Sequence, residues 1–256
     1  MDLGLTGARA LVLASSSGLG RAVAASLVGE GARVAVVSRD ASRSGQAAAD
    51  VGADLALAGD LSVPGQGARI VENAVSAWGG LDICVVNTGG GASGGILDTS
   101  GADDDVGFAA MLRPALEVAR AAAPHLSAGG QGRLVFLVAR SVVEATPELA
   151  LSSVMRSGVA AAARSLALEL APSVLVNAVV VGQFDTPALH RAVAARAAVA
   201  GVPPSQDLNE QIARIPLRRL GSAQELADVV TFLCSRRASF VTGSVVRVDG
   251  GAVRGF

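Results

Sequence analysis

Near its start the chain reads Leu13-Ala14-Ser15-Ser16-Ser17-Gly18-Leu19-Gly20-Arg21. An apolar run over residues 10–14 leads into these glycines, and an Ala-rich helical pattern over residues 19–29 follows them. Glycines at such a turn let the backbone approach a phosphate, and the helix N-terminus offers free N–H groups and the positive end of its dipole. Three serines add hydroxyl donors. We therefore interpret the segment as a nucleotide-binding turn, the alternative being an ordinary tight turn. Its candidate contacts are Ser15, Ser17, Gly18, Leu19 and Gly20.

The same alternation of apolar runs and Ala-rich stretches continues along the whole chain. We expect strands at residues 10–14, 33–37, 55–58, 83–86, 134–138, 174–179 and 245–248. Helices are expected at residues 19–29, 41–51, 67–78, 104–126, 149–170 and 223–236. Several strands are apolar throughout, as strands covered on both faces are. The pattern predicts one α/β domain over residues 1–256, a Rossmann-like doubly wound parallel sheet of about seven strands flanked by helices.

The composition is that of a folded protein with a large core, because 51% of the 256 residues are hydrophobic and 17% are charged. A net charge of −1 argues against nucleic acid or an anionic membrane as a partner. No apolar stretch reaches the roughly 20 residues that span a bilayer, and the N-terminus lacks a signal-peptide pattern. Cys84 and Cys234 lie in apolar runs, which favours buried thiols over a disulfide or a metal pair. We therefore expect a cytoplasmic protein without a metal site.

The end of the second predicted strand bears on the choice of nucleotide. It reads Val37-Ser38-Arg39-Asp40. A carboxylate at this point binds the adenosine ribose of NAD, whereas an arginine accommodates the 2′-phosphate of NADP. Because Arg39 precedes Asp40, NADP is favoured over NAD. The alternative is that the two residues form a solvated charge pair at a helix start.

Two further strand ends fit a nucleotide site. Gly59-Asp60-Leu61-Ser62 follows the third strand, and Asn87-Thr88-Gly89-Gly90-Gly91 follows the fourth. Ligands of doubly wound sheets sit beyond the carboxyl ends of the strands, where both segments are expected. The candidate contacts here are Asp60, Leu61, Asn87 and Gly89, although Asn87 could instead only brace the sheet.

Two later segments depart from the simple rhythm. Residues 182–216 contain Pro203-Pro204 and an irregular pattern, which indicates a lid of loops and helices over the site. The helix expected at residues 149–170 is rich in Ala, Ser and Gly, so another helix can approach it closely. Tight packing on its own sheet and a subunit contact are equally good interpretations of that helix.

Taken together, these segments resemble the short-chain dehydrogenase/reductase family, in its 3-oxoacyl-carrier-protein-reductase-like branch, over essentially the whole chain. The family's cofactor motif Thr-Gly-x-x-x-Gly-x-Gly is similar to residues 13–20, its adenine-contacting segment to residues 59–61, and its Asn-Asn-Ala-Gly motif to residues 87–90. Its Pro-Gly segment, whose threonine contacts the nicotinamide amide, resembles residues 181–187 and points to Thr186. Residues 215–221, 241–243 and 248–251 look like the C-terminal signature. The resemblance implies a nicotinamide cofactor, a small carbonyl or alcohol substrate, and a homodimer or homotetramer.

The departures from the family pattern fall on its chemistry. The chain contains no tyrosine, and the family's catalytic set is Asn, Ser, Tyr and Lys. The Tyr-x-x-x-Lys register places Ser152 at the tyrosine and Arg156 at the lysine. The family's serine falls on Ala139, or on Ser141 if the loop is shorter by two, and its asparagine falls on or near Met111. Ala14 also replaces the first glycine of the cofactor turn, which requires either a negative φ or strain there.

A serine hydroxyl is a far weaker acid than a phenol, and an arginine stays charged near neutral pH. Ser152 and Arg156 nevertheless share one helix face, and with Ser141 they could hold a substrate oxygen as fixed donors while water supplies the proton. The alternative is a solvent-facing Ser and Arg. His190 could approach a ligand from the lid. Glu144 is more readily a surface ion pair than a base, and His125 is expected to cap helix carbonyls.

The function favoured by these observations is an atypical NADP-dependent oxidoreductase acting on a small carbonyl or alcohol with an altered proton relay. Two other readings remain open. One is a non-redox enzyme on the same scaffold, such as a dehydratase, isomerase or cyclase. The other is a catalytically inactive subunit that binds the nucleotide.

Overall fold

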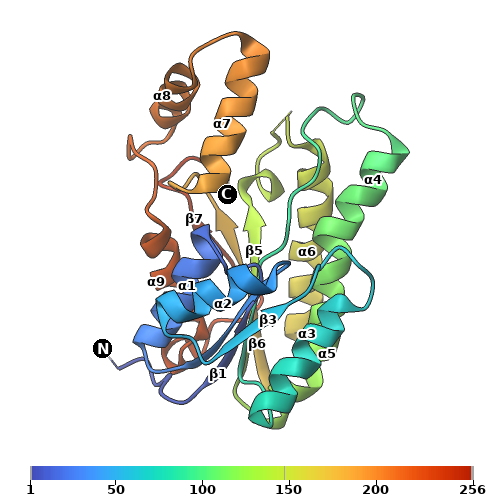
Figure 1. The fold of residues 1–256 in the computed structure, drawn as a ribbon, viewed down its shortest axis with the longest axis vertical. Coiled ribbons are helices and arrows are strands. Elements are labelled where there is room, and N and C mark those ends of the chain that lie inside the picture. Colours follow the sequence, from blue (N-terminus) through green and yellow to red (C-terminus); the bar gives the residue numbers. More distant parts are fainter. Residues whose placement is uncertain (1, 147, 255–256) are drawn as a thin grey trace.

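The computed structural model describes residues 2–146 and 148–254. Seven strands form one sheet in the order β3-β2-β1-β4-β5-β6-β7, and every neighbouring pair is parallel (Figure 1). The expected Rossmann-like doubly wound sheet is confirmed. The strands are β1 (Arg9–Val12), β2 (Arg33–Ser38), β3 (Leu55–Ala58), β4 (Ile83–Val86), β5 (Gly132–Ala139), β6 (Val174–Val181) and β7 (Val245–Val248).

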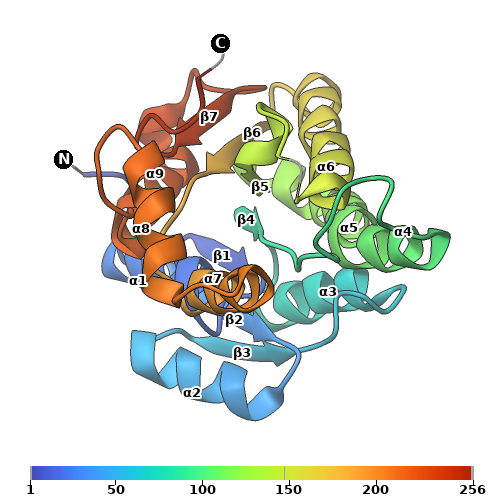
Figure 2. The same ribbon diagram turned by 90° about the horizontal axis from the view of Figure 1, so that it is seen from above.

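Helices cover both faces of the sheet (Figure 2). One face carries α1 (Gly18–Gly29), α2 (Ala41–Val51) and α9 (Ala223–Cys234). The other carries α3 (Gln66–Trp78), α5 (Arg113–Ala128) and α6 (Ala150–Glu169). The strand order reverses between β1 and β4, which creates the crevice where ligands of this architecture bind.

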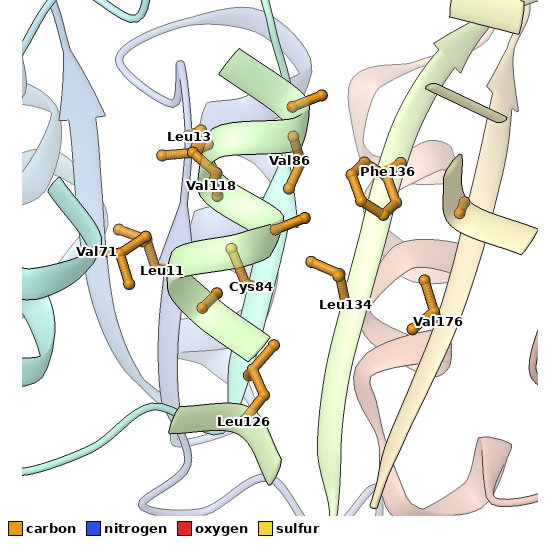
Figure 3. Close-up of a cluster of buried hydrophobic side chains, with 14 of the residues drawn as sticks. Leu11, Leu13, Val71, Cys84, Val86, Val118, Leu126, Leu134, Phe136 and Val176 are labelled. Atoms are coloured by element: carbon orange, nitrogen blue, oxygen red, sulfur yellow. The ribbon is translucent and has the colours of Figure 1, made fainter. Parts of the chain in front are cut away.

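The core explains why the strands are apolar without alternation. Successive residues of one strand point to opposite faces, so Cys84 packs under α3 and α5, whereas Val85 packs under α1 and α9. Phe136 is a fully buried aromatic side chain that fills the gap between β5 and its covering helices (Figure 3). Each fully buried Leu, Val or Phe contributes about 1.5–3 kcal/mol relative to exposure. Both faces of the sheet therefore contribute to stability.

Residues 182–216, which were predicted to depart from the strand–helix rhythm, form two helices. These are α7 (Pro187–Ala200) and α8 (Pro204–Arg214), and both stand above the carboxyl edge of the sheet (Figure 1). Thr186 caps α7 by accepting a hydrogen bond from the Leu189 N–H at 3.2 Å, and a proline occupies the start of each helix.

The helix expected over residues 104–126 is present, but it is longer than predicted and is not a regular α-helix throughout. The chain forms α4 (Gly101–Gly107), a π-helical turn at Phe108–Leu112, and then α5 without a break. A capping box between Ser100 and Asp103 starts α4 three residues before the predicted helix. A π turn holds one extra residue, so it shifts the face that the following helix presents, and such turns are frequent at functional sites.

Candidate active site at the carboxyl edge of the sheet

The turn after β1 is strained and internally bonded. Ala14 has φ 47°, so the left-handed alternative to a negative φ is the one observed. The Ser15 hydroxyl is fully buried, donates to the Val12 carbonyl at 2.6 Å and accepts from the Val37 N–H at 2.9 Å. This corrects the expectation that all three serine hydroxyls are donors to a ligand, because that of Ser15 joins β1 to β2. Among the described residues, the hydroxyls of Ser16 and Ser17 form no such bonds.

The glycines of this turn allow two close approaches. A Cβ on Gly20 would lie 2.5 Å from the carbonyl oxygen of Ala14, so only glycine lets α1 begin here. Gly18 has φ 56°, and a Cβ there would lie 3.7 Å from the methyl carbon of Thr186. The turn therefore lies next to Thr186, the N-cap of α7. Ser17 is the N-cap of α1 and makes no side-chain cap bond, so the first N–H groups of this helix, in the turn that contains Leu19, have no side-chain cap.

The end of β2 presents a cation. Asp40 caps α2, accepting from the Ser42 N–H at 2.8 Å and the Ser42 hydroxyl at 2.7 Å, and these bonds hold its pKa below the ordinary value. Its carboxylate is thus engaged by the helix. Arg39 is exposed, and its charge contributes to lowering the pKa of Asp60 across the gap.

Asp60 and Leu61, which follow β3, lie in different surroundings. Asp60 accepts from the Ser62 hydroxyl at 2.7 Å and the Ser62 N–H at 2.9 Å, which are the main causes of its lowered pKa. Leu61 packs partly buried against the core. Arg113, at the start of α5, donates a hydrogen bond to the Ser62 carbonyl and fixes this loop. No sequence signal pointed to Arg113, because the contact spans 51 positions.

The end of β4 lies beside the turn after β1. The Asn87 side chain donates to the carbonyl of Ala14 at 3.4 Å, which is the bracing role left open for it. The Gly89 carbonyl accepts from Arg156 Nη2 at 2.7 Å. Further along, Gly94 forms a parallel bridge with Leu149, so the chain after β4 runs next to the start of α6.

Arg156 is the principal charge at this point of the site. Its guanidinium is half-buried, donating also to the Leu137 carbonyl at 3.3 Å, and desolvation lowers its pKa. Among residues 2–146 and 148–254, no carboxylate forms an ion pair with it. Since an arginine remains protonated near neutral pH, Arg156 places a positive charge at the crevice, and its partners among the described residues are the carbonyl oxygens of Leu137 and Gly89.

Two serines accompany Arg156. Ser141 lies in the 3₁₀ turn Arg140–Val142 after β5, is 5% exposed, and has an Oγ without a hydrogen-bond partner among the described residues. Ser152 is half-buried one helical turn before Arg156 on α6. Ser153, by contrast, donates to the Leu149 carbonyl at 2.9 Å. A buried hydroxyl without a partner costs about 1–3 kcal/mol, which a ligand can recover.

Met111 and Ala139, which were predicted to replace the family's asparagine and serine, carry no polar group. Met111 is fully buried within the π turn, and a Cβ on Gly91 would lie 2.9 Å from its Cε. Ala139 ends β5. Met111 therefore supports the chain after β4 from beneath as an apolar contact.

The remaining titratable candidates lie elsewhere. His190 is exposed and contacts Asp185 at 2.7 Å. His125 faces Glu72 on α3 at 3.4 Å, so the expected carbonyl cap is wrong. The Glu144 side chain is exposed and takes part in none of the ion pairs within the described chain, so the surface ion pair expected for it is wrong. Within the same part of the chain, no group of His, Cys, Asp and Glu could hold a metal ion, and no helix is long and apolar enough to cross a membrane.

The geometry agrees with the comparisons to known proteins. Residues 13–253 match the family model described as enoyl-(acyl carrier protein) reductase. The chain belongs to the short-chain dehydrogenase/reductase family. Like other members of this oxidoreductase family, it carries the glycine turn after β1 on a seven-stranded parallel sheet.

Relatives in the short-chain dehydrogenase/reductase family match over nearly their full lengths. The chain is 31% identical to 1-cyclohexenylcarbonyl-CoA reductase of Streptomyces collinus, over 94% of this chain and 85% of that protein. It is 27% identical to the NADPH-dependent reductase BacG of Bacillus subtilis, over 96% of this chain and 97% of that protein. The crystal structure of L-sorbose reductase from Gluconobacter frateurii, complexed with NADPH and L-sorbose, covers 100% of both chains with a TM-score of 0.94 and 28% identity.

Proposed function

We propose that the chain is an NADPH-dependent oxidoreductase that acts on a small carbonyl compound or the corresponding alcohol. The observation that carries this proposal is the arrangement at the ends of β1 and β2. The uncapped N-terminus of α1 suits a pyrophosphate, and Gly20 leaves the backbone room that the turn needs. Arg39 is exposed while Asp40 is engaged as a helix cap, which favours the 2′-phosphate over a bare ribose. The names of the relatives, NADPH-dependent reductases among them, support the same cofactor.

Each part of the nucleotide has residues suited to it. Arg39 and Asp60 suit the adenosine end, with Leu61 as an apolar wall. Ser17, Gly18, Leu19 and Gly20 suit the pyrophosphate, and Ser15 supports them from within. Asn87 and Gly89 suit the part of the nucleotide between the pyrophosphate and Arg156. The Thr186 hydroxyl accepts a hydrogen bond from Leu189, so its own proton is available to the nicotinamide carboxamide. When bound, the reduced nicotinamide supplies a hydride; the residues of the chain bind, orient and neutralise charge.

The proton relay differs from that of a tyrosine- and lysine-dependent enzyme. The chain contains neither tyrosine nor lysine, since all 21 basic residues counted as Lys or Arg are arginines. In our proposal Ser141, Ser152 and Arg156 hold the substrate oxygen as fixed donors, and water delivers the proton. Donors fixed in a site of low dielectric stabilise developing negative charge without reorganising.

The cofactor part of the proposal is tested by calorimetric titration with NADPH and with NADH. We expect NADPH to bind more tightly. We expect Arg39→Ser to raise the Kd for NADPH about tenfold or more, the equivalent of about 1.4 kcal/mol, while the Kd for NADH changes little. Arg43→Ser removes an exposed arginine of α2 as a matched control and should leave the preference intact. Equal affinity for the two nucleotides would refute the NADP assignment.

The alternatives are separated by turnover. Stoichiometric oxidation of NADPH with a carbonyl compound would exclude both a non-redox enzyme and an inactive subunit. Tight binding of NADPH without turnover across a broad carbonyl panel would instead favour the inactive subunit. A product formed without a change in cofactor would favour a dehydratase, isomerase or cyclase.

We also propose a homodimer or homotetramer, acting in the cytoplasm. On α6, Val154 is 55% exposed and Leu168 is 85% exposed, which supports a subunit contact along this small-residue helix. Light scattering at defined concentration tests the assembly, and a monomer at every concentration would contradict it.

A further inference from the structure

A cavity lies at the amino edge of the sheet, opposite the crevice proposed for the nucleotide. Its volume is about 300 Å³, at the lower end of the range that is typical of small-molecule sites. Its walls are the N-terminal segment 4–8, the starts of β4 and β5, and the end of α9 with the 3₁₀ turn Arg236–Ala238. None of the residues assigned to the nucleotide or the substrate lines it, so a ligand here would occupy a separate site.

Arg133, at the start of β5, brings a buried cation to this cavity. The residue is 6% exposed and takes part in none of the ion pairs of the described chain. Its Nε and Nη2 donate to the Ser235 carbonyl at 3.2 and 3.1 Å, and its Nη1 donates to the carbonyls of Gln131 and Gly132 at 2.9 and 3.1 Å. A guanidinium has five N–H groups, so one N–H of Nη2 is left without an acceptor among these residues. The bonds fix the guanidinium in place, but neutral carbonyls do not cancel its charge.

Arg236 brings a second positive charge to the same cavity. Its N–H donates to the Leu3 carbonyl at 3.1 Å, and its Cδ would lie 3.0 Å from a Cβ on Gly4, so the stem of the side chain lies against the N-terminal segment. Arg236 is exposed, and it too is absent from the ion pairs of the described chain. Among the causes that lower the pKa of Arg133, desolvation comes first and the charge of Arg236 second. Two neighbouring cations therefore border one cavity.

Asp82, an acidic residue that lines the cavity, is already engaged by Arg9. Arg9 Nη2 donates to Asp82 Oδ1 at 2.8 Å, and the Nε and backbone N–H of Arg9 donate to Oδ2 at 2.8 and 2.9 Å. The side-chain bond from Arg9 is the largest cause that lowers the pKa of Asp82. Arg9 and Asp82 neutralise each other, which leaves the charges of Arg133 and Arg236 without a counterion among the described residues.

We propose that this cavity binds a phosphate group, as free phosphate or as a small phosphate monoester. Such a group carries a charge of about −1.5 to −2 at pH 7, so one group neutralises both Arg133 and Arg236. Its oxygens match the fork of N–H groups that a guanidinium presents. A bound phosphate would join the N-terminal segment to the end of α9, at the edge of the sheet away from the nucleotide. The inference does not depend on the proposed function.

Calorimetric titration at constant ionic strength tests the site, with inorganic phosphate and glycerol 3-phosphate as the two probes. The protein is first saturated with NADPH, which fills the phosphate-binding part of the crevice, and Arg39→Ser without nucleotide is titrated in parallel. We expect one site with a Kd of about 1 mM or lower for at least one probe. Tighter binding of glycerol 3-phosphate would identify a monoester as the ligand, and tighter binding of inorganic phosphate would identify the free anion. Saturable binding of neither probe would overturn the inference and leave the proposed oxidoreductase intact, whereas failure of NADPH to bind would affect only the proposed function.

Variants assign the binding to the cavity. Arg236→Gln should raise the Kd of the tighter probe about tenfold, and Arg133→Gln should abolish binding. Arg237→Gln is the matched control: it removes the same charge from an exposed residue one position along, outside the cavity lining, and should leave the Kd nearly unchanged. If Arg133→Gln does not fold because three carbonyls lose their donor, Arg236→Gln decides the assignment. An unchanged Kd in Arg236→Gln, or an equal rise in Arg237→Gln, would overturn the site.

The chemical class of the ligand is tested with malonate, a dicarboxylate of similar charge. Guanidinium forks also fit carboxylates, so malonate competes on charge and hydrogen bonding alike. We expect malonate to bind more weakly than the tighter phosphate probe under the same conditions. Tighter binding of malonate than of both phosphate probes would overturn the assignment of the cavity to a phosphate.

Discussion

At Gly20 a single methyl group would meet the carbonyl oxygen of Ala14 at 2.5 Å. We expect Gly20→Ala to lower the free energy of unfolding by about 1–3 kcal/mol, because the turn and α1 must separate. NADPH binding should weaken with it. Urea denaturation and calorimetry measure the two effects. Gly29→Ala is the control on the same helix: it is exposed, meets nothing within 4 Å, and should be neutral or stabilising by about 0.5–1 kcal/mol.

At Ala14 we expect the opposite effect, a gain in stability on substitution. Its φ of 47° costs an L-residue about 1–2 kcal/mol, part of which glycine would recover. Glycine also loses more freedom on folding, so we expect Ala14→Gly to raise stability by a net amount of about 0.5–1 kcal/mol. Ala161→Gly, at an exposed position inside α6, should instead cost about 1 kcal/mol. Thermal denaturation of both variants compares them, and equal destabilisation would show that the turn relaxes in solution.

Among the elements, α9 depends on a charged cap. Glu225 accepts from Arg219 Nη2 at 2.6 Å and Nη1 at 2.8 Å, and from the Ser222 N–H at 2.8 Å. The bonds from Arg219 are the largest cause that lowers its pKa from 4.5 to about 2. Because the folded pKa is depressed, the stability that Glu225 adds is fully present above about pH 4.5 and is lost as the pH falls toward 2.

Glu225→Gln should therefore be less stable than the unaltered protein by a constant amount from pH 7 to pH 5. The difference should shrink as the pH falls from 5 to 3. Urea denaturation of both proteins at each pH measures it. In an Arg219→Gln background the Glu225→Gln effect should be smaller at every pH. A difference that does not depend on pH would show that the carboxylate charge is not the source.

Element boundaries were predictable to different degrees for physical reasons. The predicted limits are correct for β3, β4 and β7. A short apolar run bounded by turn residues leaves little choice of where a strand begins and ends. The π turn at Phe108–Leu112 was not predictable, because inserting one residue hardly alters the apolar pattern of a long helix. The π turn is evident only in the packing of the folded chain, where Met111 lies close to Gly91.

The location of the candidate site, at the carboxyl edge of the sheet, could be predicted from the sequence. The hydrogen bonds within the site could not. Parallel strands bring their carboxyl ends together, so the gathering of Arg39, Asp60 and Asn87 follows from the strand pattern. The inward turn of the Ser15 hydroxyl and the unpaired Oγ of Ser141 depend on side-chain orientation, which adjacent residues do not determine.

At the scale of the whole molecule, Cys84 and Cys234 report on cooperative unfolding. They belong to the cores on the two faces of the sheet, and burial raises the pKa of each to about 12. Thiol reagents require exposed thiolate, so we expect both to be modified at one common rate that follows global unfolding. Saturating NADPH should slow both equally, and less so in Arg39→Ser. Rapid labelling of one cysteine in the native protein would contradict this, and labelling in denaturant provides the reference rate.

The pairing of α1 with α9 has a consequence for synthesis of the chain. Thr231 on α9 donates a hydrogen bond to Ser26 on α1 at 2.9 Å, across 205 positions of sequence. The ribosome therefore synthesises α1 long before α9, by roughly 10–40 s at about 5–20 residues per second. Once β5 and β6 have been made, the face of the sheet beneath α9 has no covering helix until α9 follows. A nascent chain halted before α9 should thus be held by chaperones that bind apolar surfaces, and it should be released only when the last helix leaves the exit tunnel.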